Sequence, residues 1–184
     1  MAHRFTTSPL SDAIELLRYY QTLGERAMAQ CPDDGLFTSL DAESNSIATI
    51  VKHLAGSMRS RWTDFLDSDG EKPDRDRDSE FEAPPATRAA VMAVWAAGWK
   101  APFDVLAGLR DADLNRSVTI RGEPHSVTQA INRQLAHCSY HIGQIVFVAR
   151  HFAASAGQWQ SLTIPRGGSA RFNAAVRAGE KSQR

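Results

Sequence analysis

Two histidines four positions apart, in the stretch HCSYHIGQIV, are the first feature of the sequence that could do chemistry. On an α-helix, residues at this spacing are rotated by about 40° from each other, so the side chains of His137 and His141 would lie on one face. Two neutral imidazoles in that position can bind one divalent metal ion. Chance also produces this spacing often, so the alternative is a pair of histidines packed into a helical core.

A third histidine, His53, lies in IVKHLAG, within a segment whose apolar residues recur every three or four positions. The pattern predicts a helix with His53 at or beside its apolar stripe, where a buried imidazole needs a polar partner. A metal ion would be such a partner, and a hydrogen bond to a neighbouring side chain is the alternative. Three histidines on two inward-facing helices favour the metal, because such sites form between facing helices. His3, His125 and His151 are not expected to share this face.

Three imidazole ligands would make a site of a particular chemical type. Structural zinc sites usually fill all four positions with protein ligands, whereas catalytic sites keep one position for water or substrate. We therefore expect one divalent metal ion, with zinc or nickel foremost and iron or manganese as further candidates, because imidazole suits several first-row metals. No glutamate forms an HExxH arrangement with the histidine pair, so peptide hydrolysis of the zinc-protease kind is not expected.

Polar side chains near the histidines are further candidates, each with a simpler alternative. Asn45 and Thr49 precede the third histidine by eight and four residues, so they could orient a ligand, or they could cap and pack the helix. Arg59 and Arg61 could contact the carboxylates of an anionic small molecule, with a solvated helix face as the alternative. Tyr140 lies between the two histidines of the pair, and we assign it to helix packing.

Four long segments with helical periodicity must position these residues. Apolar side chains recur at three- and four-residue steps, which predicts amphipathic helices at residues 8–32, 45–68, 87–114 and 127–153. Ser126, with Gln129 three residues later, predicts a capping box at the start of the last helix. Pro102 lies inside the third helix and removes one backbone hydrogen bond, so we expect a kink or a break there.

The connections between these helices have a different composition. Residues 64–82 hold nine Asp or Glu and three Lys or Arg, which fits a charged surface loop or, alternatively, a lid over the metal opening. Residues 115–127 alternate briefly between polar and apolar around Arg121 and Gly122. This second connection predicts a short hairpin or extended link before the last long helix.

The residues after the last helix carry one apolar patch, formed by Trp159, Leu162 and Ile164. We expect this patch to pack across the helices as an extended arm. Residues 173–184 contain several basic side chains, and we expect them to form a frayed, solvated tail.

Length and composition bound the remaining possibilities. The 184 residues fit one domain of ordinary size, so we treat residues 1–184 as a single domain. Hydrophobic residues make up 42% and charged residues 23%, and the 21 basic and 21 acidic residues cancel, so we expect no nucleic-acid partner. No stretch reads as a signal peptide or as a membrane span of about 20 apolar residues. With two cysteines, Cys31 and Cys138, far apart in sequence, we expect a cytoplasmic protein with buried thiols.

Three stretches together resemble the DinB-like superfamily of metal-dependent proteins, also called YfiT-like, and more narrowly a bacterial branch of unknown function. They are NSIATIVKHLAGSMRSRW, DFLDSDGEKPDRDRDSEF and HCSYHIGQI, and the resemblance extends over about residues 8–172. It implies an all-α four-helix bundle with an up-down-down-up arrangement, in which the second helix supplies one metal-binding histidine and the fourth supplies an HxxxH pair. Those ligands fall on His53, His137 and His141. The resemblance also implies a homodimer.

Relatives of this kind include thiol transferases and isomerases that use low-molecular-weight thiols. The resemblance therefore implies metal-dependent transfer of a small thiol to an electrophilic small-molecule substrate, or a related hydrolase or isomerase reaction. The alternative is a metal-binding stress-response or binding module without turnover. The two differ in how they respond to metal removal, because a structural site loses thermal stability with its metal.

Overall fold

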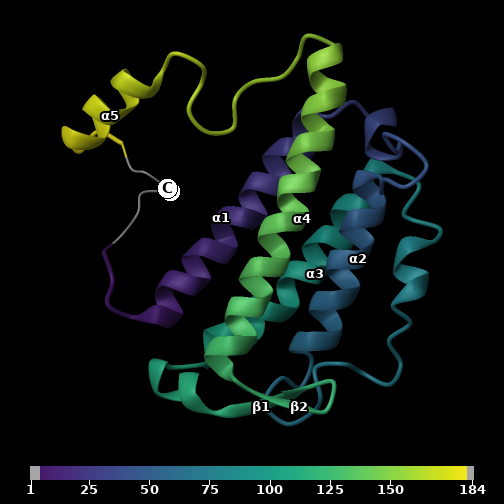
Figure 1. Ribbon diagram of the computed structural model, residues 1–184, viewed down its shortest axis with the longest axis vertical. Coiled ribbons are helices and arrows are strands. Elements are labelled where there is room, and N and C mark those ends of the chain that lie inside the picture. The colour runs from purple at the N-terminus through teal and green to yellow at the C-terminus, as the bar shows by residue number, and fades with distance from the viewer. Residues whose placement is uncertain (1–4, 182–184) are drawn as a thin grey trace.

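The computed structural model describes residues 5–181, and this part of the chain is mostly helical (Figure 1). His3 therefore lies outside the described residues. Within them are five α-helices, three short 3-10 helices and one two-stranded antiparallel sheet. The α-helices are α1 Pro9–Gln30, α2 Ile47–Trp62, α3 Arg88–Gly108, α4 Val127–Ser155 and α5 Ser169–Arg177; the 3-10 helices are η1 Asp34–Leu36, η2 Asp78–Phe81 and η3 Asp111–Asn115; the strands are β1 Ser117–Ile120 and β2 Glu123–Ser126.

Hydroxyl side chains start the four long helices. The capping residues of α1, α2, α3 and α4 each accept a hydrogen bond from the backbone N–H three residues later; they are Ser8, Ser46, Thr87 and Ser126. Such a bond satisfies one of the N–H groups that a helix leaves unpaired at its first turn. At α4, Gln129 also accepts a hydrogen bond from the Ser126 N–H, so the predicted capping box is confirmed.

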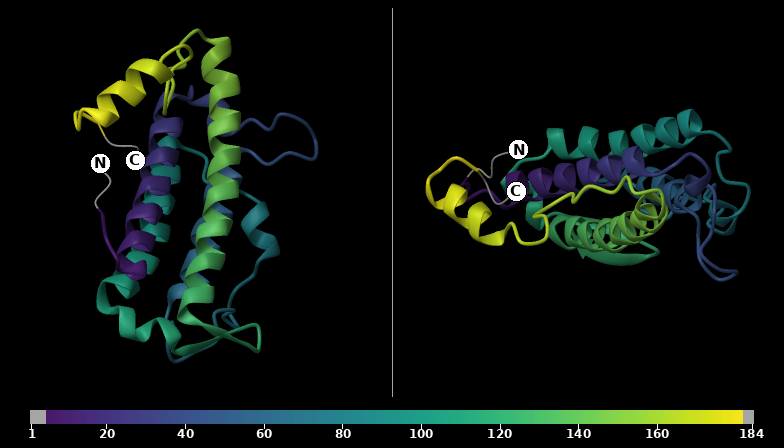
Figure 2. Two further views of the ribbon diagram at one scale, coloured as in Figure 1. Left: turned by 60° about the vertical axis from the view of Figure 1, so that its left-hand side comes forward. Right: turned by 90° about the horizontal axis from the view of Figure 1, so that it is seen from above.

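The four long helices lie side by side, with α2 packed along α3 and α1 along α4 (Figures 1 and 2). The indole rings of Trp62, Trp95 and Trp99 are among the largest fully buried side chains between them. A Cβ atom at Gly98 would lie 2.7 Å from the Cα atom of Ala55, so only glycine permits the observed approach of α3 to α2. The core is therefore closely packed between these two helices.

The third long helix continues through Pro102 to Gly108, so the expected break does not occur there. A proline ring inside a helix removes the hydrogen bond to the carbonyl four residues earlier. Pro102 itself is buried, and packing against neighbouring elements stabilises a helix more than any single backbone hydrogen bond does. The tertiary contacts of α3 therefore tolerate the proline.

The predicted hairpin is present as β1 and β2, and it is tied to the connection that follows α2. Arg121 and Gly122 form its turn with φ angles of 55° and 77°. The Asp69 carboxylate accepts hydrogen bonds from both of their backbone N–H groups, at 2.8 and 2.7 Å, and the Gly70 N–H donates to the Thr119 carbonyl at 2.8 Å. The start of the charged connection and the hairpin thus form one unit at the same end of the helices.

The rest of the charged connection runs along α2 rather than standing free in solvent (Figure 2). The Lys52 ammonium group of α2 donates to the carbonyls of Ser79 and Glu82, at 2.6 and 2.7 Å. These bonds hold η2 against the middle of α2. The charged connection therefore lies on the surface, as expected, but its η2 part is docked on α2.

The C-terminal residues differ from the sequence expectation. Leu162 is buried and Trp159 packs against the core, but Ile164 is exposed. The chain then forms α5, which covers part of the expected frayed tail, while the last residues of that tail, 182–184, lie outside the described range. None of the α5 residues is buried, and the helix stands away from the four long ones (Figure 2). Across the described residues, every helix is too short or too polar to cross a membrane.

Candidate metal centre

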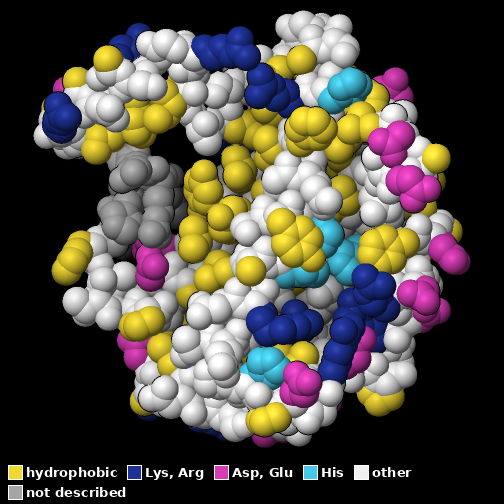
Figure 3. Space-filling model, in the orientation of Figure 1, with side chains coloured by type: hydrophobic (Ala, Val, Ile, Leu, Met, Phe, Trp, Pro, Cys, Tyr) yellow, Lys and Arg dark blue, Asp and Glu magenta, His cyan; other side chains and the backbone are white. Residues whose placement is uncertain are grey.

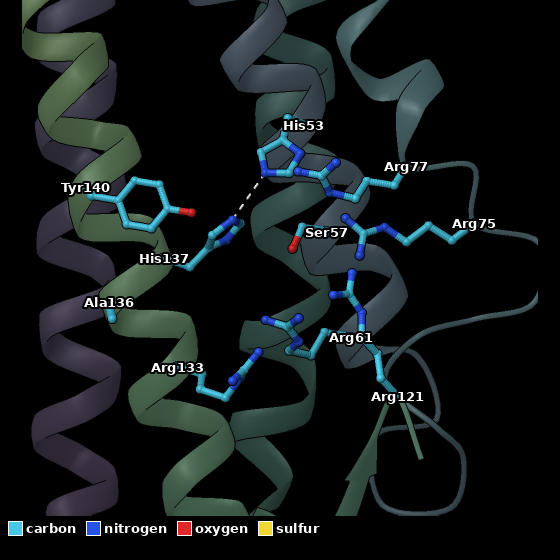
Figure 4. A pocket seen from close by; sticks show the side chains of 10 residues that line it. All are labelled: His53, Ser57, Arg61, Arg75, Arg77, Arg121, Arg133, Ala136, His137 and Tyr140. Carbon is cyan, nitrogen blue, oxygen red and sulfur yellow. Dashed lines mark hydrogen bonds between the residues drawn. The ribbon is translucent and has the colours of Figure 1, made fainter. Parts of the chain in front are cut away.

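Two facing helices bring the three predicted histidines together. His53 lies on α2, and His137 and His141 lie one turn apart on α4. One ring nitrogen from each lies within 4.8 Å of the others, so the cluster could hold a metal ion. The Nε2 atoms of His53 and His137 are 3.2 Å apart (Figure 4). His53 and His141 are buried and His137 is half-buried.

Hydrogen bonds at the far side of two rings fix which nitrogens face the cluster. The Nδ1–H of His53 donates to Oε2 of Glu80 at 2.8 Å, and the Nδ1–H of His141 donates to Oε1 of Gln144 at 2.7 Å. Each ring then keeps a lone pair on Nε2, which is the form of histidine that binds metals. The Nδ1 atom of His137 is buried and has no hydrogen-bond partner among the residues described.

The separation of the two Nε2 atoms fits a shared metal ion. The lone pair on Nε2 of His53 lies 3.2 Å from Nε2 of His137, so the two nitrogens share either a proton, in a hydrogen bond donated by His137, or a cation. Imidazole nitrogens bound to one tetrahedral zinc ion at about 2.0 to 2.1 Å would lie about 3.3 Å apart. The donor set of three imidazoles also suits zinc, nickel, copper and iron. The residues present therefore fit a divalent metal.

Burial keeps the histidines of α4 neutral. Burial, together with repulsion from the nearby His141 and His53, lowers the pKa of His137 to about 3. Burial likewise lowers the pKa of His141 to about 4, although the hydrogen bond with Gln144 acts in the opposite direction. A metal ion must displace a proton from a charged imidazole before it binds. Because these rings are already neutral, they can bind a metal ion without losing a proton.

Glu80 is the main residue of the site that the sequence did not reveal. It is 5% exposed and accepts, besides the His53 bond, hydrogen bonds from Nε and Nη2 of Arg75 at 2.8 and 3.0 Å. Burial alone would raise the pKa of Glu80, but the hydrogen bonds from His53 and Arg75 and the charge of Arg75 together lower it. A Cβ atom at Gly56 would overlap the carboxylate, so this glycine lets Glu80 reach α2.

The one sequence signal for this contact is the residue next to Glu80. Phe81 is the single large apolar side chain between residues 67 and 82. Its ring stacks on the His53 imidazole with centroids 4.7 Å apart. An aromatic residue in an otherwise charged loop indicates that the loop docks on the protein at that point.

A pocket of about 350 Å³ opens beside the histidines (Figure 4). Residues of α2, α4, the charged connection and the hairpin line it: His53, Ser57, Arg61, Arg75, Arg77, Arg121, Arg133, Ala136, His137 and Tyr140. On the molecular surface, basic side chains gather next to the histidines on this face (Figure 3). The candidate metal centre is therefore accessible to a small molecule from a basic opening.

The polar side chains that the sequence analysis placed near the histidines differ in burial and in whether they line the pocket. Arg61 is only 7% exposed, so its placement on a solvated helix face is wrong, whereas Arg59 is exposed and does not line the pocket. Thr49 bonds with the capping serine of α2, which confirms its role as a cap residue, and Asn45 is exposed. Tyr140 is 54% exposed and lines the pocket instead of packing between helices.

Comparison with known proteins assigns the chain to a family. The sequence matches the family described as "Protein of unknown function (DUF1572)" over residues 4–168. The chain belongs to the DUF1572 family. No curated protein and no solved structure matches it. The DUF1572 match includes all three histidines, Glu80 and every residue that lines the pocket, so the whole candidate site lies within the family's region.

Proposed function

We propose that this DUF1572 protein binds one divalent metal ion, zinc or nickel foremost, through His53, His137 and His141. The observation that carries the proposal is the convergence of three imidazoles from two helices, two of them oriented by hydrogen bonds on the opposite ring nitrogen. Such a partner behind a ligand is a regular feature of metal-binding histidines. We further propose that the four long helices form the up-down-down-up bundle of DinB-like proteins.

We propose that the site serves metal-dependent transfer of a low-molecular-weight thiol, or a related hydrolase or isomerase reaction. A bound divalent ion would supply Lewis acidity, lowering the pKa of a thiol or water in its open position. The pocket supports this proposal because about 350 Å³ is enough for a small ligand. Cys31 and Cys138 are both buried and neither lines the pocket, so a thiol nucleophile would come from a small molecule.

Metal content tests the first part of the proposal. Chelator-free, tag-cleaved protein would be assayed by inductively coupled plasma mass spectrometry beside His53→Ala and His141→Ala. His151→Ala is the matched control, because this histidine is also on α4 but is exposed and outside the cluster. We expect close to one metal per chain in the parent and the control, and loss of metal in both cluster variants.

Reloading and melting curves complete the test. Failure to bind zinc, nickel, manganese or iron after reloading would overturn the metal proposal. If the metal binds, a small change in melting temperature on chelation supports an open, reactive site, and the loaded protein would be assayed with small thiols and electrophiles. A large loss of thermal stability on chelation would instead indicate the structural role of a binding module without turnover.

A further inference from the structure

The pocket beside the histidines carries more positive charge than its own carboxylates neutralise. Five of its ten lining residues are arginines, and none is Asp or Glu. Arg75 is fully engaged by Glu80 and Glu71, and Arg121 shares Glu71 at 3.3 Å. The positive charge that these carboxylates leave unbalanced is therefore carried by the other arginines of the pocket, Arg61, Arg77 and Arg133.

Arg61 is the residue with the clearest need for a partner. Its side chain is more than nine-tenths buried, at 7% exposure, and its Nε atom is buried without a hydrogen-bond partner. Within the part of the chain that the structure describes, it makes neither an ion pair nor a hydrogen bond. Glu71 acts on Arg61 electrostatically, but its carboxylate is already paired with Arg75 and Arg121. A guanidinium held at low exposure without an ion pair of its own is destabilising, and a bound anion would offset that cost.

Arg133 of α4 faces Arg61 of α2 across the pocket (Figure 4). It too lacks an ion pair or hydrogen bond within the described residues. Two guanidinium groups that approach each other repel. An anion between them is attracted to both, and this attraction offsets their repulsion. Guanidinium groups bind carboxylate and phosphate oxygens through paired N–H donors. Arg61 and Arg133 thus form a two-sided cradle, which we call the arginine pair.

The shape of the site limits the size of the anion. The arginine pair lies inside a pocket of about 350 Å³, and the whole chain has a formal net charge of zero. A polyanion such as nucleic acid needs an extended basic surface instead. The same pocket is lined at another point by His53 and His137, so a ligand held at the arginine pair would reach the histidines with its other end.

We infer that the pocket binds a small molecule with a carboxylate or phosphate group, held between Arg61 and Arg133, whose opposite end faces His53 and His137. This inference deepens the proposed function, because it names the chemical class of the substrate or cosubstrate. Ser57, which is buried between His53 and Arg61 on α2 and lines the pocket, adds a hydroxyl group along the path between the two ends.

The test is titration calorimetry of the full chain at low ionic strength, after chelator treatment, with inorganic phosphate and with succinate as probes. We expect saturable binding of at least one probe, weakened at least tenfold in Arg61→Gln and in Arg133→Gln. Arg59→Gln is the matched control, since Arg59 lies on the same helix but is exposed and outside the pocket, and it should bind as the parent does. Arg133 is exposed, so its variant is expected to fold even if the Arg61 variant does not.

The result separates this inference from the proposed metal site. Preference for phosphate over succinate, or the reverse, would identify the anionic group, and either preference supports the inference. No saturable binding at millimolar probe, or equal affinity in the parent and the Arg133 variant, would overturn it. Because the titration uses metal-free protein, anion binding can succeed while metal loading fails, and metal loading can succeed while anion binding fails.

Discussion

The two sides of α2 are built on opposite principles. Toward α3, the helix presents small and apolar residues, and Gly98 of α3 approaches Ala55 so closely that no side chain fits between them. Toward α4 and the pocket, it presents His53, Ser57 and Arg61. Each of these residues is four positions from the next, so they form a single stripe along the helix. All three are buried, with exposures of 4%, 2% and 7%.

The difference shows how one helix can serve both stability and function. Close apolar packing on the α3 side contributes free energy of folding, because buried apolar surface and dispersion contacts favour the native state. A buried polar stripe has the opposite effect unless each group has a partner. His53 has Glu80, but Arg61 has none within the described residues. The stability gained on the side of α2 that faces α3 therefore offsets the cost of the buried polar groups on the side that faces α4 and the pocket.

Replacing Gly98 by Leu should have the largest effect, because it attacks the close-packed side. The new side chain would overlap the backbone of Ala55, and we expect a loss of about 3 kcal/mol in the free energy of unfolding, the upper end of the range for overpacked cores. Urea denaturation followed by circular dichroism measures it. Gly143→Leu is the control, because a Cβ atom there meets nothing within 4 Å. Equal stability of the two variants would contradict the close approach of α3 to α2.

On the polar side, Glu80→Gln should weaken metal binding without unfolding the protein. The neutral amide keeps the shape of the side chain but removes the charge that orients His53 and increases its basicity. Losses for partners of this kind are about 10- to 100-fold in metal affinity, or about 1.4 to 2.7 kcal/mol. Competition with a chromogenic chelator measures it.

Glu82→Gln is the control for the Glu80 variant, because Glu82 is exposed and lies in the same segment. A metal affinity that is equal in the two variants would show that Glu80 is structural and does not position the ligand. Rescue of affinity in a Glu80→Asp variant would support a role for the charge itself.

The seam between α2 and α4 contains a buried hydrogen bond whose loss should have an intermediate effect. Nε1–H of Trp62 donates to Oε1 of Gln134 at 3.0 Å. Gln134→Leu leaves the indole N–H unsatisfied in the core, so we expect a loss of about 1 to 2 kcal/mol in unfolding free energy. In a Trp62→Phe background the same change should cost much less. An equal cost in both backgrounds would show that cavity formation, not the hydrogen bond, sets the effect.

Arg61→Met should give the smallest effect and the opposite sign. The substitution removes a buried charge but keeps much of the side-chain volume, so the anion-free protein should gain about 1 kcal/mol of stability. Thermal unfolding in a buffer without phosphate or carboxylate measures the gain. Arg59→Met, at an exposed position of the same helix, should be close to neutral. A destabilised Arg61 variant would indicate that the guanidinium is already compensated within the fold.

The sequence predicted the parts of the molecule that follow a helical period. The starts of the long helices are visible because serine caps precede apolar periodicity, as at Ser126. His137 and His141 could be placed on one face because their spacing matches a helix turn. His53 could be added because it lies within an apolar stripe, and the family resemblance selected the three together.

What the sequence did not predict lies in segments without a period. Glu80 and Arg75 are two of many charged residues in the connection after α2, and nothing in their spacing distinguishes the buried ones from the exposed ones. Arg121 reaches the pocket only because the hairpin folds back beside the same connection. The solvent exposure of Tyr140 depends on what α4 packs against, which local periodicity does not determine.

The two hydrogen bonds from Asp69 to the hairpin turn also bear on how the site opens. They join two segments about 50 residues apart, so the hairpin and the connection are expected to detach from the helices together. In native-state hydrogen exchange, the amide protons of Arg121 and Gly122 should then exchange at the rate at which this paired unit opens. Arg121 and Arg75 would leave the pocket in that same event, so exchange at the hairpin turn would report the lifetime of the closed pocket.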